Sequence, residues 1–474
     1  MASLDPAAAA EIDAVYAAFA ERVEAPGVVA GVVKDGGLAH LFTHGVSDLA
    51  TGAPVTADTC FRIASMTKQV TATAILMLRD EGRLSLEASA LTYVPELADL
   101  PPPTADSPPI TVRDLLSHTE GFVTDDPWAD RAMRMTPDDF TAFLRDGGLF
   151  AQAPGVAFEY SNLGYGILGR IISNLCGRPF QQVIGERLLR PLGMDATRFD
   201  PDAVPDGQRA RGYWRRGGAY GEEPPEPDGE IAAMGGIITP AKDYARWVAF
   251  LLDAWPPRDE AETGPVRRAT RRELAVSHAM PGPARTRTAG GETLPVAIAY
   301  GYGLASTHDP QLGRCLAHSG GLPGFGSNMF FSPDAGIGLF AFANVTYAGP
   351  EAANVEAAGV LQAHGLWRAR PVAVSPALQA AADAVAQAFA AGRLDAIQAW
   401  FAPNLLADLP LESRNRALSE LKSRLGDSRL TRIEARHALA GRLHFAGERG
   451  EAACELALTP GADPKIQVLR FDPA

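Results

Sequence analysis

Cysteine is scarce in this chain of 474 residues, which contains only four. Cys60, Cys176, Cys315 and Cys454 are scattered, so they indicate neither a disulfide framework nor a metal site with closely spaced ligands. The nine histidines include no His-Glu-x-x-His motif and form no cluster of ligands. We therefore expect no metal and no cofactor. Since Cys60 and Cys315 follow or precede apolar segments, we expect both to be packed thiols.

Long apolar runs and an excess of positive charge are also missing. No stretch of 18 apolar residues occurs, so the sequence predicts no transmembrane helix. Residues 1–6 lack the basic and apolar parts of a signal peptide, which makes a cytoplasmic location the expectation, with a removed export signal left open. The net charge of −13 argues against nucleic acid or an anionic membrane as the main partner.

Lysine is the rarest charged residue, with five copies against 19 serines, so chance predicts roughly 0.2 Ser-x-x-Lys motifs. Two are present. Ser419 and Lys422 lie in the charged run 414–427, which reads as a solvated amphipathic helix. Ser65 and Lys68 instead join an extended segment to a run with apolar residues at helical spacing.

The first motif combines a hydroxyl and an amine on one face of the start of a helix. Ser65 would lie near unpaired backbone N–H groups and the positive end of the helix dipole. Lys68 is one turn further, so its amine returns to the same face and can take the serine proton when it is partly desolvated. The structural alternative is a helix-capping serine followed by an exposed lysine, and the motif alone does not decide between the two.

Two further segments carry groups that suit such a nucleophile. Tyr160-Ser161-Asn162 precedes a glycine-rich apolar helix, where a phenol could exchange protons with Ser65 and an amide could orient a substrate. His318-Ser319-Gly320-Gly321 follows an apolar run, and its glycines could bring backbone N–H groups close to a carbonyl oxygen. Each segment alone is equally consistent with an ordinary turn.

Two common motifs are not supported. Residues 164–169 match Gly-x-Gly-x-x-Gly, but no apolar strand precedes them, so close helix packing explains the glycines better than a dinucleotide site. No serine lies in a complete Gly-x-Ser-x-Gly, which leaves a nucleophile elbow of the α/β-hydrolase type without support.

The pattern of elements predicts a sheet that begins near the N-terminus and is completed near residue 345. Helices are expected over residues 6–23, 65–82, 110–121 with its end marked by Gly121, and 351–367, with strands over 27–33, 38–47 and several short ones within 300–344. Residues 224–228 and the arginine-rich 258–272 read as surface excursions. After a break at 371–376, we expect helices over 377–391, 394–401 and 414–425, followed by strands over 430–438, 442–445, 452–459 and 466–471.

The ordered motifs Ser65-x-x-Lys68, Tyr160-x-Asn162 and His318-x-Gly320 resemble those of the serine β-lactamase and penicillin-recognising enzyme superfamily. The resemblance is closest to the branch of class C β-lactamases, D-alanyl-D-alanine carboxypeptidases, D-aminopeptidases and β-lactamase-like esterases. It covers roughly residues 6–368 and extends to segments such as 115–121 and 300–304.

The resemblance implies an α+β fold in which an antiparallel sheet flanked by helices adjoins a helical subdomain, with the site between them. Residues 1–368 would form the hydrolase domain, 369–375 a linker, and 376–474 a small α+β accessory domain similar to cystatin or NTF2-like folds. Ser65 would be acylated, and Lys68 and Tyr160 would be the general base and acid. Backbone N–H groups of Ser65 and Gly321 would form the oxyanion hole. The substrate-binding residues would be Asn162, His318, Ser319 and Gly320.

One departure bears on the substrate. Class C β-lactamases carry Lys-Thr-Gly at the third motif, where the lysine helps to bind the β-lactam carboxylate, and this chain has His318. We therefore expect a serine hydrolase acting on a small ester, amide or short peptide rather than an efficient β-lactamase. The alternatives are an acyltransferase using the same acyl-enzyme and a non-catalytic binding or scaffold protein. Whether the chain forms a homo-oligomer is left open.

Overall fold

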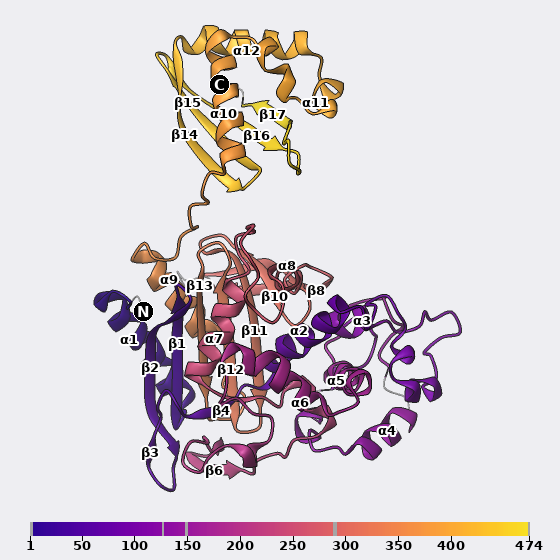
Figure 1. The fold of residues 1–474 in the computed structure, drawn as a ribbon. Coiled ribbons are helices and arrows are strands. Elements are labelled where there is room, and N and C mark those ends of the chain that lie inside the picture. Colours follow the sequence, from indigo (N-terminus) through magenta and orange to yellow (C-terminus); the bar gives the residue numbers. More distant parts are fainter. Residues whose placement is uncertain (1–2, 126–127, 147–149, 288–291, 473–474) are drawn as a thin grey trace. The chain divides into compact units, whose positions relative to one another are not determined.

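The computed structural model describes residues 3–125, 128–146, 150–287 and 292–472 (Figure 1). The chain divides into two compact units, one of Met1–Trp255 with Ala261–Ala369 and one of Pro256–Glu260 with Arg370–Ala474. The buried apolar residues of 376–474 form a core of their own, separate from the cores of the first unit. That the two parts fold as independent domains stays a prediction.

Within the described residues, the first unit is built on an antiparallel sheet of nine strands in the order β3-β2-β1-β13-β12-β11-β10-β9-β8. The strands are β1 (Gly27–Lys34), β2 (Gly37–Asp48), β3 (Ala53–Pro54), β8 (Ala279–Arg287), β9 (Thr293–Tyr300), β10 (Ala305–Asp309), β11 (Gly313–Leu322), β12 (Phe325–Ser332) and β13 (Ile337–Ala343). The N-terminal hairpin therefore pairs with the last strand of the unit, as the sequence predicts.

Both faces of the sheet are covered by helices, and the strand sequence reflects this. In β1, Val28 and Val32 belong to one core while Val29 and Val33 belong to the other, because successive side chains of a strand point to opposite faces. The first core, which contains Val28 and Val32, also includes residues of helices α1 (Pro6–Val23) and α9 (Glu351–Ala363). The second core, which contains Val29 and Val33, includes residues of α7 (Ala241–Leu252) (Figure 1).

The second core extends into a helical part. Its elements are α2 (Thr67–Asp80), α3 (Val112–Ser117), α4 (Pro137–Asp146), α5 (Asn162–Cys176), α6 (Phe180–Ile184), α8 (Arg268–Glu273) and the 3-10 turns η1 (Ala64–Met66) and η8 (Glu230–Met234). Helix α2 is buried from Thr67 to Leu78, so its polar side chains need internal partners. Gln69, for example, donates to the Tyr244 hydroxyl and accepts from the Trp247 indole.

Two short ribbons complete the first unit. Strand β4 (Cys60–Arg62) pairs with β7 (Ile238–Pro240), and β5 (Gly212–Arg216) pairs with β6 (Ala219–Glu223). The first ribbon matters most for function, because β4 leads directly into η1 and α2, where Ser65 and Lys68 lie.

The glycines of residues 164–169 serve close packing, as expected. A Cβ at Gly164 would lie 2.3 Å from a carboxylate oxygen of Glu120, and one at Gly169 would lie 2.6 Å from Cβ of Ala233. Helix α5 can therefore approach its neighbours more closely than a larger residue would allow.

Three expectations need correction. Helix α3 ends at Ser117 rather than at Gly121, because His118 takes the left-handed conformation with φ of 59°. Ser65 lies in the 3-10 turn η1 and not in the first turn of the following helix. The segment after residue 278 forms β8 and β9 and widens the sheet, which the sequence did not indicate.

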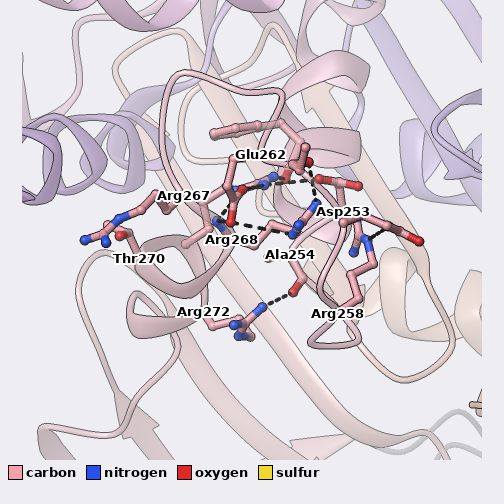
Figure 2. Close-up of polar contacts among 12 residues, drawn as sticks. Asp253, Ala254, Arg258, Glu262, Arg267, Arg268, Thr270 and Arg272 are labelled. Atoms are coloured by element: carbon pink, nitrogen blue, oxygen red, sulfur yellow. Dashed lines mark hydrogen bonds and ion pairs between the residues drawn. The ribbon is translucent and has the colours of Figure 1, made fainter. Parts of the chain in front are cut away.

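The arginine-rich segment 258–272 is anchored rather than a plain surface excursion. Arg268 and Arg271 on α8 are buried, and Arg271 pairs with Asp253 at 3.1 Å. Figure 2 shows Arg272 donating to the carbonyl oxygen of Ala254, at 2.6 Å, with Glu262 near the start of α8. The arginines thus tie α8 to the end of α7 and to the loop that follows it.

The predicted helices and strands beyond residue 376 are confirmed. They are α10 (Pro376–Ala391), the 3-10 helix η9 (Asp395–Trp400), α12 (Leu411–Leu425), β14 (Ser428–His437), β15 (Ala440–Gly447), β16 (Gly450–Leu458) and β17 (Ile466–Phe471). The short helix α11 (Pro403–Asp408) was not predicted. The strands form a sheet in the order β14-β15-β16-β17. The second Ser-x-x-Lys motif lies on α12, where Leu421 is buried and Ser419 is exposed. In the described part of the chain, no helix has both the length and the apolar character needed to cross a membrane.

Candidate active site

Ser65 and Lys68 are in hydrogen-bond contact. The ammonium Nζ of Lys68 lies 3.0 Å from Oγ of Ser65. Lys68 is completely buried, whereas Ser65 is partly exposed. Ala64, directly before the serine, has φ of 49°, a strained conformation for a residue with a side chain that is typical of functional turns. The alternative of an exposed lysine is therefore wrong.

The buried ammonium is held by two further acceptors. Nζ of Lys68 donates to Oδ1 of Asn162 at 2.6 Å and to the carbonyl oxygen of Met234, in η8, at 3.0 Å. It also lies 4.8 Å from the centre of the Tyr160 ring and 5.5 Å from that of Tyr165, where the ring faces attract a cation. These contacts fix the position of the amine relative to the serine.

Tyr160 and Asn162 stand at the beginning of α5, and Asp125 fixes that beginning. Its carboxylate accepts from the backbone N–H groups of Asn162, at 2.7 Å, and of Leu163, at 2.8 Å. It also accepts from the Ser161 hydroxyl at 3.2 Å. The first N–H groups of a helix have no partner within the helix, so an acidic side chain here stabilises the helix start. Asn162 is thereby held against Lys68.

His118 holds the same segment from the other side. Its carbonyl oxygen accepts from the backbone N–H of Glu159 at 2.9 Å, and its Nδ1 accepts from that of Ser161 at 3.2 Å. Its ring centre lies 4.4 Å from that of Tyr160. Burial, with Lys68 nearby, holds the pKa of His118 well below its usual value, so the ring is neutral and its proton is on Nε2. Among the described residues, that Nε2 has no hydrogen-bond partner.

The third motif lies on β11 and approaches the serine segment very closely. A Cβ at Gly320 would be 2.4 Å from the carbonyl oxygen of Ile63, two residues before Ser65, so only glycine permits this approach. Ser319 accepts a hydrogen bond from the Asn328 amide at 3.0 Å. Gly320 and Gly321 line the same cleft as Ser65, as an oxyanion hole would require.

His318 is a neutral side chain in this site. Its Nδ1–H donates to the carbonyl oxygen of Ser319 at 2.6 Å, and its Nε2 accepts from the Tyr300 hydroxyl at 3.0 Å. Burial, together with the nearby charge of Lys68, lowers the pKa of His318 to about 3. The position that bears a lysine in class C β-lactamases thus bears no positive charge here.

A cleft of about 480 Å³ gives access to Ser65. Tyr160, His318, Ser319, Gly320 and Gly321 line it together with residues from loops and from β8, β9 and β10. Lys68 and Asn162 are fully buried and lie behind the serine rather than in the lining. Their contacts favour a role for Asn162 in orienting the lysine, and its predicted contact with substrate stays a prediction.

The cysteines are packed as expected. Cys60, Cys315 and Cys454 are buried, and burial raises the pKa of the Cys60 thiol to about 12, which makes it a poor nucleophile at neutral pH. Among the residues with described positions, no group of three or more His, Cys, Asp or Glu side chains is arranged to hold a metal ion.

Sequence reasoning missed several residues of the site. His118 and Tyr300 occur in segments on which the resemblance rests, but none of the three motifs includes them, so the sequence predicted no role for either residue. Asp125 follows a short loop and gave no signal, because its partners at the start of α5 are more than 35 residues away. Tyr347 lies against Gly321, since a Cβ there would be 2.5 Å from its ring, and nothing in the sequence pointed to that contact.

Known proteins resemble this chain in sequence. The family described as "Beta-lactamase" matches residues 12–364. Esterase EstB of Burkholderia gladioli is 29% identical over 390 residues, which cover 73% of this chain and 95% of the esterase. Protein flp of Staphylococcus aureus (strain MW2) is 26% identical over 339 residues, covering 71% of this chain and 63% of its own length. The chain thus spans less than two thirds of that relative.

A solved structure resembles the whole chain in fold. The octameric penicillin-binding protein homologue from Pyrococcus abyssi superposes with a TM-score of 0.63 at 20% sequence identity, covering 97% of this chain and 93% of that one. At that identity the likeness concerns the fold alone. It agrees with the α+β architecture of an antiparallel sheet and flanking helices.

Proposed function

Because the chain belongs to the beta-lactamase family, we propose that it is a serine hydrolase that cleaves a carboxylic ester or an amide through an acyl-enzyme on Ser65. The observation that carries this proposal is the contact of 3.0 Å between Nζ of the buried Lys68 and Oγ of the partly exposed Ser65. A hydroxyl becomes a useful nucleophile when a positioned base removes its proton.

The proposed reaction has two halves. The Lys68–Tyr160 pair reacts in the form that holds one proton fewer than an ammonium together with a phenol, so it can accept a proton. Oγ of Ser65 attacks the carbonyl carbon while its proton passes to that pair, and the backbone N–H groups of Ser65 and Gly321 stabilise the oxyanion. The intermediate collapses when the proton is delivered to the leaving alcohol or amine. Water then attacks the ester on Ser65 with the same pair acting first as base and then as acid, which releases the carboxylic acid and restores the serine.

The neutral third motif favours an ester or amide that needs no bound carboxylate. His318 cannot provide the charge by which the lysine of class C β-lactamases helps to bind the β-lactam carboxylate. The likeness to an esterase over most of both chains supports ester hydrolysis as the first activity to test. Transfer of the acyl group to an alcohol or amine, in place of water, is the nearest alternative.

The test is intact-mass spectrometry after mixing with p-nitrophenyl butyrate, with release of p-nitrophenolate followed by absorbance. We expect a burst and a single butyryl adduct that maps to Ser65, and Ser65→Ala should abolish both. Ser419→Ala is the matched control, because it removes the serine of the second Ser-x-x-Lys motif on α12. Lys68→Ala and Tyr160→Phe should each lower kcat by orders of magnitude, since they act as one proton-transfer unit with the serine.

A binding or scaffold protein that retains the fold would behave differently. It would show neither an adduct nor Ser65-dependent release with esters, amides and a fluorophosphonate probe, while remaining folded. Turnover that persists in Ser65→Ala would contradict the assignment of the nucleophile. Assembly of several copies also stays a proposal, supported by the octameric neighbour through fold likeness alone.

A further inference from the structure

A line of buried polar side chains runs from helix α1 to the cleft at Ser65. The hydroxyl of Tyr16, on α1, donates to Oδ1 of Asn354, on α9, at 2.7 Å. Nδ2 of Asn354 donates to Oδ1 of Asn328, on β12, at 2.6 Å. Nδ2 of Asn328 donates at 3.0 Å to Oγ of Ser319, which lines the cleft. These four residues are called the polar line below.

The polar line lies in an apolar part of the molecule. Tyr16, Asn354 and Asn328 are each at most 2% exposed, and Tyr16 belongs to the apolar core that includes residues of α1 and α9. Buried groups that hydrogen-bond to each other can often be replaced by apolar groups of the same shape with little loss of stability. Stability alone therefore does not account for two amides here, whereas a role at the cleft end of the line would.

Backbone carbonyl groups fix the direction of the hydrogen bonds in the line. Nδ2 of Asn354 also donates to the carbonyl oxygen of Asn328, at 3.2 Å, and a carbonyl oxygen can only accept. The amide nitrogen of Asn354 therefore faces Asn328, whose Oδ1 is the acceptor. The other end of that amide, Nδ2, faces Ser319 and also the carbonyl oxygen of His318, at 3.5 Å. Oγ of Ser319 thus accepts in its contact with the line.

The Ser319 hydroxyl keeps its own proton for a ligand. A hydroxyl can donate one hydrogen bond in addition to those it accepts. In the described part of the chain, the structure shows no protein acceptor for this proton, and Ser319 is partly exposed in the cleft lining. Both ring nitrogens of the neighbouring His318 are used within the protein, because Nδ1–H donates to the carbonyl oxygen of Ser319 and Nε2 accepts from Tyr300. A polar substrate group at this wall therefore meets a donor.

Ser319 lies near the reaction centre but outside the groups that transfer protons. It stands two residues before Gly321 on β11, so the two residues lie on the same face of the strand with Cα atoms roughly 7 Å apart. If the N–H of Gly321 holds the scissile carbonyl oxygen, an atom that meets the Ser319 hydroxyl lies roughly three or four bonds further along the substrate.

We propose that Asn328 and Asn354 are positioning residues that hold the Ser319 hydroxyl as a donor, so that the cleft prefers esters or amides with a second, neutral oxygen acceptor. An ether or amide oxygen suits this place better than a carboxylate, because the uncharged His318 offers no opposite charge. This inference rests on the proposed function, since it concerns the substrate of the same serine.

Three thioesters of equal length test the preference. S-butyl thiopentanoate has no second acceptor, S-butyl 3-methoxythiopropanoate has an ether oxygen in the acyl chain, and S-(2-methoxyethyl) thiopentanoate has one in the thiol. The released thiol is measured by absorbance. For at least one ether, the ratio of its kcat/KM to that of the alkyl thioester should be about fivefold higher in the unsubstituted protein than in Ser319→Ala, which lacks the donor. Comparing the ratio between variants cancels differences in intrinsic reactivity.

Substitutions elsewhere in the polar line test the positioning role. Asn328→Leu removes the donor to Ser319, so the hydroxyl can turn away from the cleft, and the ratio should fall about as far as in Ser319→Ala. Asn354→Leu, outside the cleft lining, should lower the ratio in part, because Asn328 loses the donor that fixes its amide.

Tyr16→Phe is the matched control. It also removes a buried hydrogen bond from the polar line, but the carbonyl oxygen of Asn328 still directs the amide of Asn354. The ratio should therefore keep its value in the unsubstituted protein, whatever the loss of stability.

The outcomes separate this inference from the proposed function. A purely structural role predicts that Asn328→Leu and Asn354→Leu lose activity on all three thioesters with an unchanged ratio. That result, a ratio in the unsubstituted protein equal to that of Ser319→Ala, or a loss in Tyr16→Phe as large as in Asn328→Leu would overturn the inference while leaving a Ser65-dependent hydrolase intact. If Asn328→Leu does not fold, Asn354→Leu decides. Absence of Ser65-dependent hydrolysis of every thioester, together with absence of any Ser65 adduct, would overturn both.

Discussion

At the scale of single residues, the position of Tyr160 depends on a side chain that has no part in the proposed proton transfer. His118 accepts from the N–H groups on either side of Tyr160, one through its carbonyl oxygen and one through Nδ1, and its ring packs on the phenol. Since Nδ1 must accept, the ring has to stay neutral, and its burial ensures this. We regard His118 as a positioning residue.

A matched pair of substitutions tests that role. Asparagine and glycine both tolerate the left-handed conformation of His118, and both remove the ring, but only asparagine keeps an acceptor near the place of Nδ1. We expect kcat of His118→Gly to be about fivefold below that of His118→Asn, because one hydrogen bond to the Tyr160 segment is worth about 1 kcal/mol. KM should differ little between them.

The two variants should also have similar melting temperatures. If they show equal kcat, or if KM rather than kcat separates them, the acceptor at Nδ1 does not position Tyr160.

The residues of the site differ in how far the sequence could reveal them. Ser65, Lys68 and Asn162 were predictable as a group because their spacing and order follow a recurrent motif, and the structure brings them into contact. Asp125 and Tyr347 carry no such signal. Their contacts with the start of α5 and with Gly321 join segments that are far apart in the sequence, so the residues next to them along the chain do not indicate those contacts.

At the scale of secondary-structure elements, the proposed catalysis depends on how closely β11 approaches the turn that carries Ser65. Gly320 is pressed between the carbonyl oxygen of Ile63 and Oγ of Ser327, each 2.4 Å from where a Cβ would be. A methyl group there must push β11 away from η1. That movement would separate the N–H of Gly321 from Ser65.

We therefore expect Gly320→Ala to lower kcat for p-nitrophenyl butyrate at least 100-fold and to destabilise the first unit by about 1–3 kcal/mol through overpacking. Urea unfolding and steady-state kinetics measure the two effects. Gly185→Ala is the control, since apart from its chain neighbours and the backbone of its own helix no atom lies within 4 Å of the added carbon. Normal activity in Gly320→Ala would show that the close approach is not needed.

Elements were easier to predict than their ends and their partners. The apolar periodicity of α1 and β1 identified them almost to the residue, because local pattern and burial agree there. After residue 376 the sequence identified every element except α11, with ends that differ by up to three residues. Helix α3 ends before the predicted Gly121 because His118 adopts a left-handed conformation, which the sequence did not predict for a histidine. Strands β8 and β9 escaped notice because they lie at one edge of the sheet, and because β9 is exposed or only part-buried until Tyr300.

At the scale of the whole molecule, the buried apolar residues form separate hydrophobic cores. The core after residue 376 is centred on an aromatic group in which Phe389 stacks on Phe445, with ring centres 4.4 Å apart. Phe19 on α1 belongs to a different core, together with the sheet residues that α1 covers. Units with separate cores can unfold in separate steps, and then no single free energy of unfolding describes the chain.

Calorimetry of the full chain should accordingly show two transitions that respond to different substitutions. Phe389→Ala costs about 3–5 kcal/mol in a packed core and should lower one transition by about 10 °C or more, because a unit of about 100 residues is sensitive to such a loss. Below the lowered transition, Phe389→Ala should release p-nitrophenolate in a burst of the same amplitude as the unsubstituted protein, because Ser65 belongs to the other unit. Phe19→Ala should lower the other transition instead. If each variant moves both transitions together, the two cores unfold as one cooperative system, and the C-terminal unit then stabilises the fold that holds Ser65.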